Sequence, residues 1–213
     1  MREARDRLTS TSGTRPAFDH ELLRQHARTR ISASLVVVLL VAAAGLLSSL
    51  WVRPINAAIW TFVILCVHAL TITSSRKFLG EQSTPAALRT WRMRFILLDL
   101  MYGLSWTFIL VHPGGADVTS NTLLLFLMLL VVAVSIMLAS SLPIAAVAAT
   151  APVTLAIALN FVLRGQLDDY LLSVLTIAAE CFFVLLAYRL HSTTLAALEA
   201  GEDGEDYEVE CLA

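Results

Sequence analysis

The chain has 213 residues, of which 57% are hydrophobic and 15% charged, with a mean hydropathy of +0.74. A soluble domain of this size would not need repeated uncharged runs, so the composition excludes an ordinary water-soluble protein. The formal net charge is −2, and no nucleic-acid partner is expected. Six apolar runs are long enough to cross about 30 Å of hydrocarbon as helices. The sequence predicts an all-α, polytopic transmembrane bundle with both termini cytoplasmic.

Residues 1–30 form a basic tail that precedes the first apolar run and holds seven of the fifteen Lys and Arg residues. In a helix, one side of this tail would carry Phe18, Leu22 and Leu23. The polar positions would include Arg24, Arg28 and Arg30. This pattern is compatible with a helix that lies on an anionic membrane surface. The alternative is an ordinary basic flank that only sets topology.

Residues 31–190 form the predicted six-helix transmembrane domain. The predicted spans are residues 31–50, 57–74, 95–111, 122–140, 144–162 and 170–190. Only Ser141, Leu142 and Pro143 separate the fourth span from the fifth. The alternative is one kinked helix over 123–162, but it would be about 60 Å long, twice the membrane thickness. Two spans are therefore predicted, with Pro143 opening the fifth.

The basic residues orient these spans. With the amino terminus inside, thirteen of the fifteen Lys and Arg residues lie on the cytoplasmic side, and only Arg53 and Arg164 lie outside. The positive-inside rule then places both termini in the cytoplasm. Residues 191–213 are expected to continue the last helix and then to form a disordered acidic tail, because six of the seventeen acidic residues lie between Glu202 and Glu210.

The fifth span is rich in small residues that let helices approach closely in lipid, so we expect it to be central in the bundle. These residues are Ala145, Ala146, Ala148, Ala149, Ala151, Ala156 and Ala158. Pro152 lies near its middle and should bend it locally, which makes it a candidate hinge. A static packing feature is the alternative.

Three titratable residues lie within the predicted spans, where charged side chains are costly and should face the bundle interior. They are His68, Asp99 and Glu180. Helical spacing places Tyr102 on the face of Asp99, and His68 and Asp99 lie at similar depth because both spans approach the same loop. We therefore consider His68, Asp99, Tyr102 and Glu180 as a candidate intramembrane polar cluster. The alternative is interhelical hydrogen bonding that only holds the bundle together.

The sequence contains no phosphate-binding loop, zinc-protease motif or nucleophile elbow. Its three cysteines follow no disulfide or metal-site spacing. No catalytic, cofactor-binding or metal-ligating residues are predicted, and whether the chain serves an enzyme stays open.

Three segments carry a resemblance to a known family. They are residues 18–30 (FDHELLRQHARTR), residues 89–106 (RTWRMRFILLDLMYGLSW) and residues 188–200 (YRLHSTTLAALEA). Together they resemble the N-terminal multi-pass membrane region of alphaproteobacterial sensor histidine kinases. In that family this region usually precedes PAS and kinase domains, which this sequence lacks. The resemblance implies a truncated or solitary input module, and no kinase residue carries over; His191 is expected to be an ordinary interfacial histidine.

Two functions from different classes follow. The first is a sensor and anchoring module for signal transduction in a two-component system, in which the sixth span passes helix repacking to the cytoplasmic side. The second is a small transporter or channel in which His68, Asp99 and Glu180 line a pathway. The expected partners are the lipid bilayer, a second copy of the chain in a homodimer and a cytoplasmic signalling protein.

Overall fold

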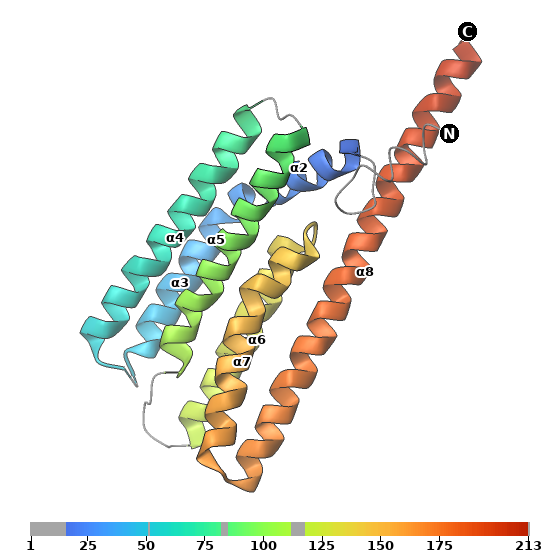
Figure 1. Cartoon of the computed structure of the whole chain (residues 1–213). Coiled ribbons are helices and arrows are strands. Elements are labelled where there is room, and N and C mark those ends of the chain that lie inside the picture. The colour runs from blue at the N-terminus through green and yellow to red at the C-terminus, as the bar shows by residue number, and fades with distance from the viewer. Residues whose placement is uncertain (1–15, 51, 82–84, 112–117, 213) are drawn as a thin grey trace.

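The structure is a computed structural model that describes residues 16–50, 52–81, 85–111 and 118–212 (Figure 1). These residues form helices only, which confirms the all-α prediction. The helices are α2 (Pro16–Ser32), α3 (Ser34–Ser48), α4 (Pro54–Gly80), α5 (Pro85–Val111), α6 (Val118–Ala139), α7 (Pro143–Arg164) and α8 (Leu167–Leu212). Of the predicted basic tail, residues 1–15 lie outside the described residues.

Proline marks where helices begin. Pro16, Pro54, Pro85 and Pro143 are each the first residue of a helix. This position suits proline because its fixed φ is helical and the first amide of a helix has no partner to lose. The short connection before Pro143 separates α6 from α7, so the prediction of two helices there is confirmed. Gly165 ends α7 with a φ of +75°, a left-handed conformation that favours glycine.

The helices extend beyond the predicted spans. A polar loop of about twenty residues was expected before the third span, but α4 continues to Gly80 and α5 already begins at Pro85. That expectation was wrong because a helix satisfies its own backbone and does not stop where the side chains become polar. Phe78 of α4 packs edge-on against Trp91 and Phe95 of α5, with ring centroids 5.6 and 5.7 Å apart, and so joins the two extensions.

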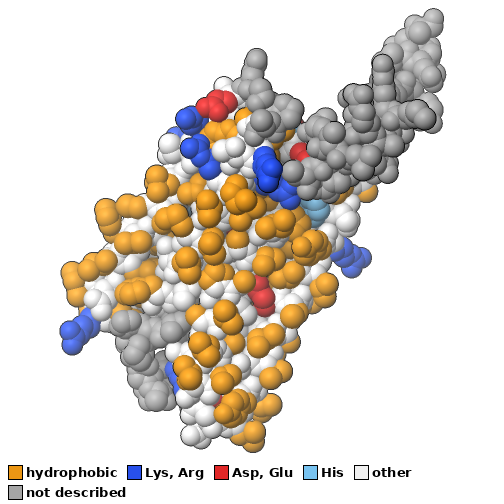
Figure 2. Space-filling view, viewed as in Figure 1, with side chains coloured by type: hydrophobic (Ala, Val, Ile, Leu, Met, Phe, Trp, Pro, Cys, Tyr) orange, Lys and Arg blue, Asp and Glu red, His pale blue; other side chains and the backbone are white. Residues whose placement is uncertain are grey.

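Three of the described helices are long and apolar enough to cross a membrane: α4, α7 and the Leu167–Ala196 part of α8. A fourth span results if Asp19–Ser32 and α3 are counted together, although they meet at a bend of 53°. Large hydrophobic side chains are exposed along these helices, among them Phe62, Leu155 and Phe182. Figure 2 shows such side chains over most of the visible face, as expected for a surface that contacts lipid.

The alanine-rich helix α7 is central, as predicted. It packs against α5, α6 and α8, and none of its seven alanines is exposed. At Gly103 of α5 the two backbones come so close that an added Cβ would lie 2.2 Å from the carbonyl oxygen of Ala149. Small residues on both helices therefore allow α5 and α7 to pack closely.

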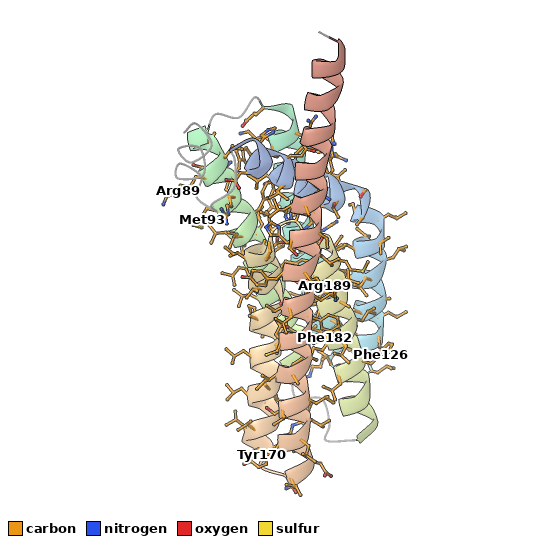
Figure 3. The ribbon with its side chains drawn as sticks, turned by 90° about the vertical axis from the view of Figure 1, so that its right-hand side faces the viewer. Arg89, Met93, Phe126, Tyr170, Phe182 and Arg189 are labelled. Carbon is orange, nitrogen blue, oxygen red and sulfur yellow. The ribbon has the colours of Figure 1, made fainter. Side chains whose placement is uncertain are left out.

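Helix α8 is the longest element. It begins with Asp168 and Asp169 in its first turn, passes along α7 and α6, and continues beyond the other helices (Figure 1). Figure 3 shows Tyr170 near its lower end, with Phe182 and Arg189 further along. The acidic segment that was expected to be disordered continues the helix to Leu212. Extending an existing helix needs no new nucleus, so an acidic composition alone does not end it.

Candidate functional site

Two residues of the predicted polar cluster hold the junction between α2 and α3, where the chain bends by 53°. Arg30, in the last turn of α2, forms an ion pair with Asp99 of α5. Ser34, the first residue of α3, is hydrogen-bonded to His68 Nε2 of α4 at 3.1 Å. A polar contact therefore lies on each side of the bend, buried at Arg30 and half-buried at Ser34, and each contact joins the bend to a different helix.

The Arg30–Asp99 pair is deeply buried, with 4% and 2% of the two side chains exposed. His26, one turn before Arg30 on α2, lies on the other side of the carboxylate. Its Nε2 is 3.5 Å from the second oxygen of Asp99, which is too long for a good hydrogen bond. Within the part of the chain that the structure describes, neither ring nitrogen of His26 has a hydrogen-bond partner. The carboxylate therefore neutralises Arg30, and His26 fills the space beside them.

Arg30 was not predicted as a site residue. We placed it among the solvent-facing positions of an amphipathic helix, and this was wrong. In the structure one face of α2 is buried, and it carries Leu22, Leu23, His26, Ala27 and Arg30. These positions follow a four-residue repeat, which is the available signal in the sequence. We did not use this repeat, because a basic residue directly before a membrane span usually only sets the topology.

Tyr102 and His68 are both buried, at 4% and 6% exposure, but no hydrogen bond joins either of them to Asp99 among the described residues. Tyr102 lies one turn beyond Asp99 and packs edge-on against Trp106, with centroids 6.2 Å apart. Trp106 in turn packs against Trp60 of α4, which donates a hydrogen bond to the carbonyl of Ser105. Tyr102 therefore belongs to an aromatic contact between α4 and α5.

Glu180 lies in a separate polar contact between α8 and α7. Its two carboxylate oxygens accept hydrogen bonds from the hydroxyls of Thr150 at 2.6 Å and Thr154 at 2.9 Å. A second contact between these helices is the hydrogen bond that Ser173 donates to the carbonyl of Ala158. In the described part of the chain, no hydrogen bond or ion pair links Glu180 to His68, Asp99 or Tyr102. Asp99, His68 and Glu180 thus occupy three separate polar contacts, and Tyr102 lies in an aromatic one.

We expect the Glu180→Ala variant to lose only about 0.6–1.7 kcal/mol of unfolding free energy, the range for hydrogen bonds between membrane helices. The effect is small because the Thr150 hydroxyl can donate to the carbonyl of Ala146 in its own helix instead. Unfolding by SDS titration in mixed micelles, followed by circular dichroism, measures the change. Glu180→Gln is the matched control, since its amide oxygen still accepts one bond; a loss equal to that of Glu180→Ala would contradict this account.

Pro152, the candidate hinge, lies inside α7, which continues as one helix from Pro143 to Arg164. Proline removes the amide donor to the carbonyl four residues earlier, so the backbone between Ala148 and Pro152 lacks one helical hydrogen bond. Thr150 and Thr154 flank this weak point and hold Glu180 of α8. The one interior position of α7 that lacks its backbone donor therefore lies between the two threonines that contact α8.

These polar contacts position pairs of helices relative to each other. No group of three or more His, Cys, Asp or Glu side chains is placed to hold a metal ion within the residues described. The polar contacts instead join α2 to α5, α3 to α4, and α7 to α8, so each depends on how two helices are placed. No protein-family model matches this chain, and comparison with curated proteins and with solved structures finds no match either.

Proposed function

We propose that this chain is a membrane sensor and anchoring module that spans a bacterial inner membrane six times, through α3 to α8, with both termini in the cytoplasm. By its sequence it resembles the input region of a two-component sensor histidine kinase. The observation that carries the proposal is α8, a helix that packs within the bundle and continues without interruption to Leu212. Its 46 residues correspond to about 70 Å, far more than a membrane span needs.

The direction of the helices supports this topology. Helix α2 and the far end of α8 lie at the same end of the bundle (Figure 1), and this is the end near which Arg76, Lys77 and Arg89 lie. Arg53, directly before α4, and Arg164, the last residue of α7, lie at the opposite end. This distribution agrees with the positive-inside rule for six spans and two cytoplasmic termini.

Signal transfer in this module would depend on the packing of α8 against α7. The contact is made by Glu180 with Thr150 and Thr154, next to the interrupted backbone at Pro152. A ligand or a lipid change that favours one packing of α7 over another would shift α8, because a ligand moves an equilibrium only by its differential affinity for the two states. The displacement would reach the cytoplasmic side through the uninterrupted helix.

A transporter or channel lined by His68, Asp99 and Glu180 is the alternative. The observed contacts argue against a continuous pathway. Asp99 of α5 is paired with Arg30 of α2, whereas Glu180 of α8 accepts hydrogen bonds from two threonine hydroxyls of α7. A conducting pathway would need polar groups that follow one another through the bundle. Proton flux into liposomes that contain the protein, abolished by Glu180→Gln, would support the transporter instead.

The proposal is tested by fusing residues 1–200 to the soluble catalytic region of a histidine kinase and measuring autophosphorylation in membranes. One alanine inserted after Ala196 turns everything beyond it by about 100°, whereas seven inserted residues restore the original face within about 20°. We expect the single insertion to change kinase output several-fold and the seven-residue insertion to restore it. Output that is the same for all three fusions would contradict transmission through α8.

A further inference from the structure

An open apolar groove lies between α3 and α4, at the end of the bundle opposite α2. It encloses about 580 Å³, within the range of about 300–1,000 Å³ that is common for small-molecule sites. Small residues at Gly45, Ala57 and Ala58 form its floor, and the exposed side chains of Leu46 and Phe62 form its walls. Gly45 lets α3 and α4 approach closely here, since an added Cβ would lie 2.3 Å from the Thr61 hydroxyl.

The groove offers almost no hydrogen-bonding capacity to a ligand. Its two hydroxyl-bearing residues already donate within their own helices, Ser49 to the carbonyl of Leu46 at 2.6 Å and Thr61 to the carbonyl of Ala57 at 2.8 Å. A polar ligand would lose its water there without compensation. The chemistry of the lining therefore fits a flexible hydrocarbon chain.

A positive charge stands at the end of this groove. Pro54 lines the groove, and Arg53, directly before it, is exposed. In the proposed topology this end faces the outer headgroup region of the membrane, where Arg53 and Arg164 are the only basic residues. A guanidinium group binds phosphate oxygens through short, charge-assisted hydrogen bonds. An apolar groove with a cation at its membrane-surface end is complementary to a lipid with a negatively charged headgroup.

We propose that the α3–α4 groove binds one anionic phospholipid, with an acyl chain along Ala58 and Thr61 and the headgroup phosphate at Arg53. This inference rests on the proposed membrane embedding. It adds a specific lipid ligand on α3 and α4, at the end of the bundle opposite α2 and on the side away from α8 (Figure 1). It does not depend on signal transfer through α8.

The test is native mass spectrometry of the full chain released from detergent micelles that contain dioleoylphosphatidylglycerol. The Ala58→Phe variant fills the groove with an exposed side chain that leaves the core unchanged, and Arg53→Gln removes the charge. Matched controls are Ala69→Phe, at an exposed position of α4 outside the groove, and Arg164→Gln, the other basic residue at this end. We expect both groove variants to weaken the phospholipid adduct about tenfold or more, and both controls to retain it.

Dioleoylglycerol, which has the same chains and no phosphate, is expected to bind at least about tenfold more weakly than the phospholipid. Equal adducts in all four variants, or equal binding of the two lipids, would overturn the proposal. A concentration-dependent dimer that Ala58→Phe abolishes would assign the groove to a second copy and would also overturn it. Extraction into detergent-free carbonate buffer would instead refute the membrane embedding, so the two failures are distinguishable.

Discussion

Replacing Asp99 by alanine is expected to lower the free energy of unfolding by about 3–5 kcal/mol, because it leaves the Arg30 guanidinium buried without a counter-charge. Only 4% of the Arg30 side chain is exposed, so water cannot take the place of the carboxylate unless α2 moves away from the bundle. SDS titration in mixed micelles measures the loss. Increased protease cleavage near the α2–α3 bend would report the movement of α2.

The pair can be tested as a unit. We expect Arg30→Met combined with Asp99→Leu to recover most of the lost stability, since removing both buried charges also removes both desolvation penalties. Arg28→Met is the matched control, because Arg28 is exposed on the opposite side of the same helix. The single variants Arg30→Met and Asp99→Leu complete the comparison. If the double variant loses as much unfolding free energy as these two added together, the two charges are not coupled, and the ion pair does not hold α2 in place.

Replacing Gly103 by alanine is expected to destabilise the bundle by at least about 1–3 kcal/mol, the usual effect of overpacking a core. The new methyl group would lie 2.2 Å from the carbonyl oxygen of Ala149, and the obstacle is backbone that cannot rotate away. Helices α5 and α7 would have to separate, and α7 carries the contacts to α8. The unfolding free energy measures the loss of stability. A change in tryptophan fluorescence reports the separation of the helices, because Trp106 on α5 is fully buried.

The control for this prediction is Gly80→Ala in the last turn of α4. A Cβ at Gly80 would meet nothing within 4 Å, so only the helix propensity changes. Alanine is favoured over glycine in a helix by up to about 1 kcal/mol, so this variant should be neutral or slightly more stable. Equal destabilisation by the two substitutions would show that general loss of glycine, and not the α5–α7 contact, is responsible.

Much of the secondary structure was predictable because lipid-crossing helices need long apolar runs. Most residues of the six predicted spans are helical, but only three of the described helices, or four with the bent pair, are long and apolar enough to cross a membrane. The predicted span 31–50 is divided by the bend between α2 and α3. The division at Pro143 was anticipated from helix length. The central place of α7 followed from its alanines, since small residues pack closely in lipid. The helix ends were not predictable from hydropathy, because α4 and α5 extend as helices into polar sequence and are joined there by Phe78, Trp91 and Phe95.

The candidate site was predictable only in part. Asp99, His68 and Glu180 were identified because titratable residues within apolar helices need a partner. Their partners were not identified, since Arg30, Ser34, Thr150 and Thr154 are unremarkable in the sequence. The expected single cluster is instead three separate contacts, because helical spacing places residues on a face but does not say which helix covers that face.

The sequence by itself determined that this chain is helical, where its apolar helices lie and which of their residues are too polar to face hydrocarbon, because each of these properties depends on a residue and its near neighbours. Only the tertiary structure decided that α2 bends by 53° from α3, and that Arg30 thereby reaches Asp99 across 69 positions of the chain. The Arg30–Asp99 contact depends on how whole helices pack, and the pattern of neighbouring residues in the sequence does not predict it.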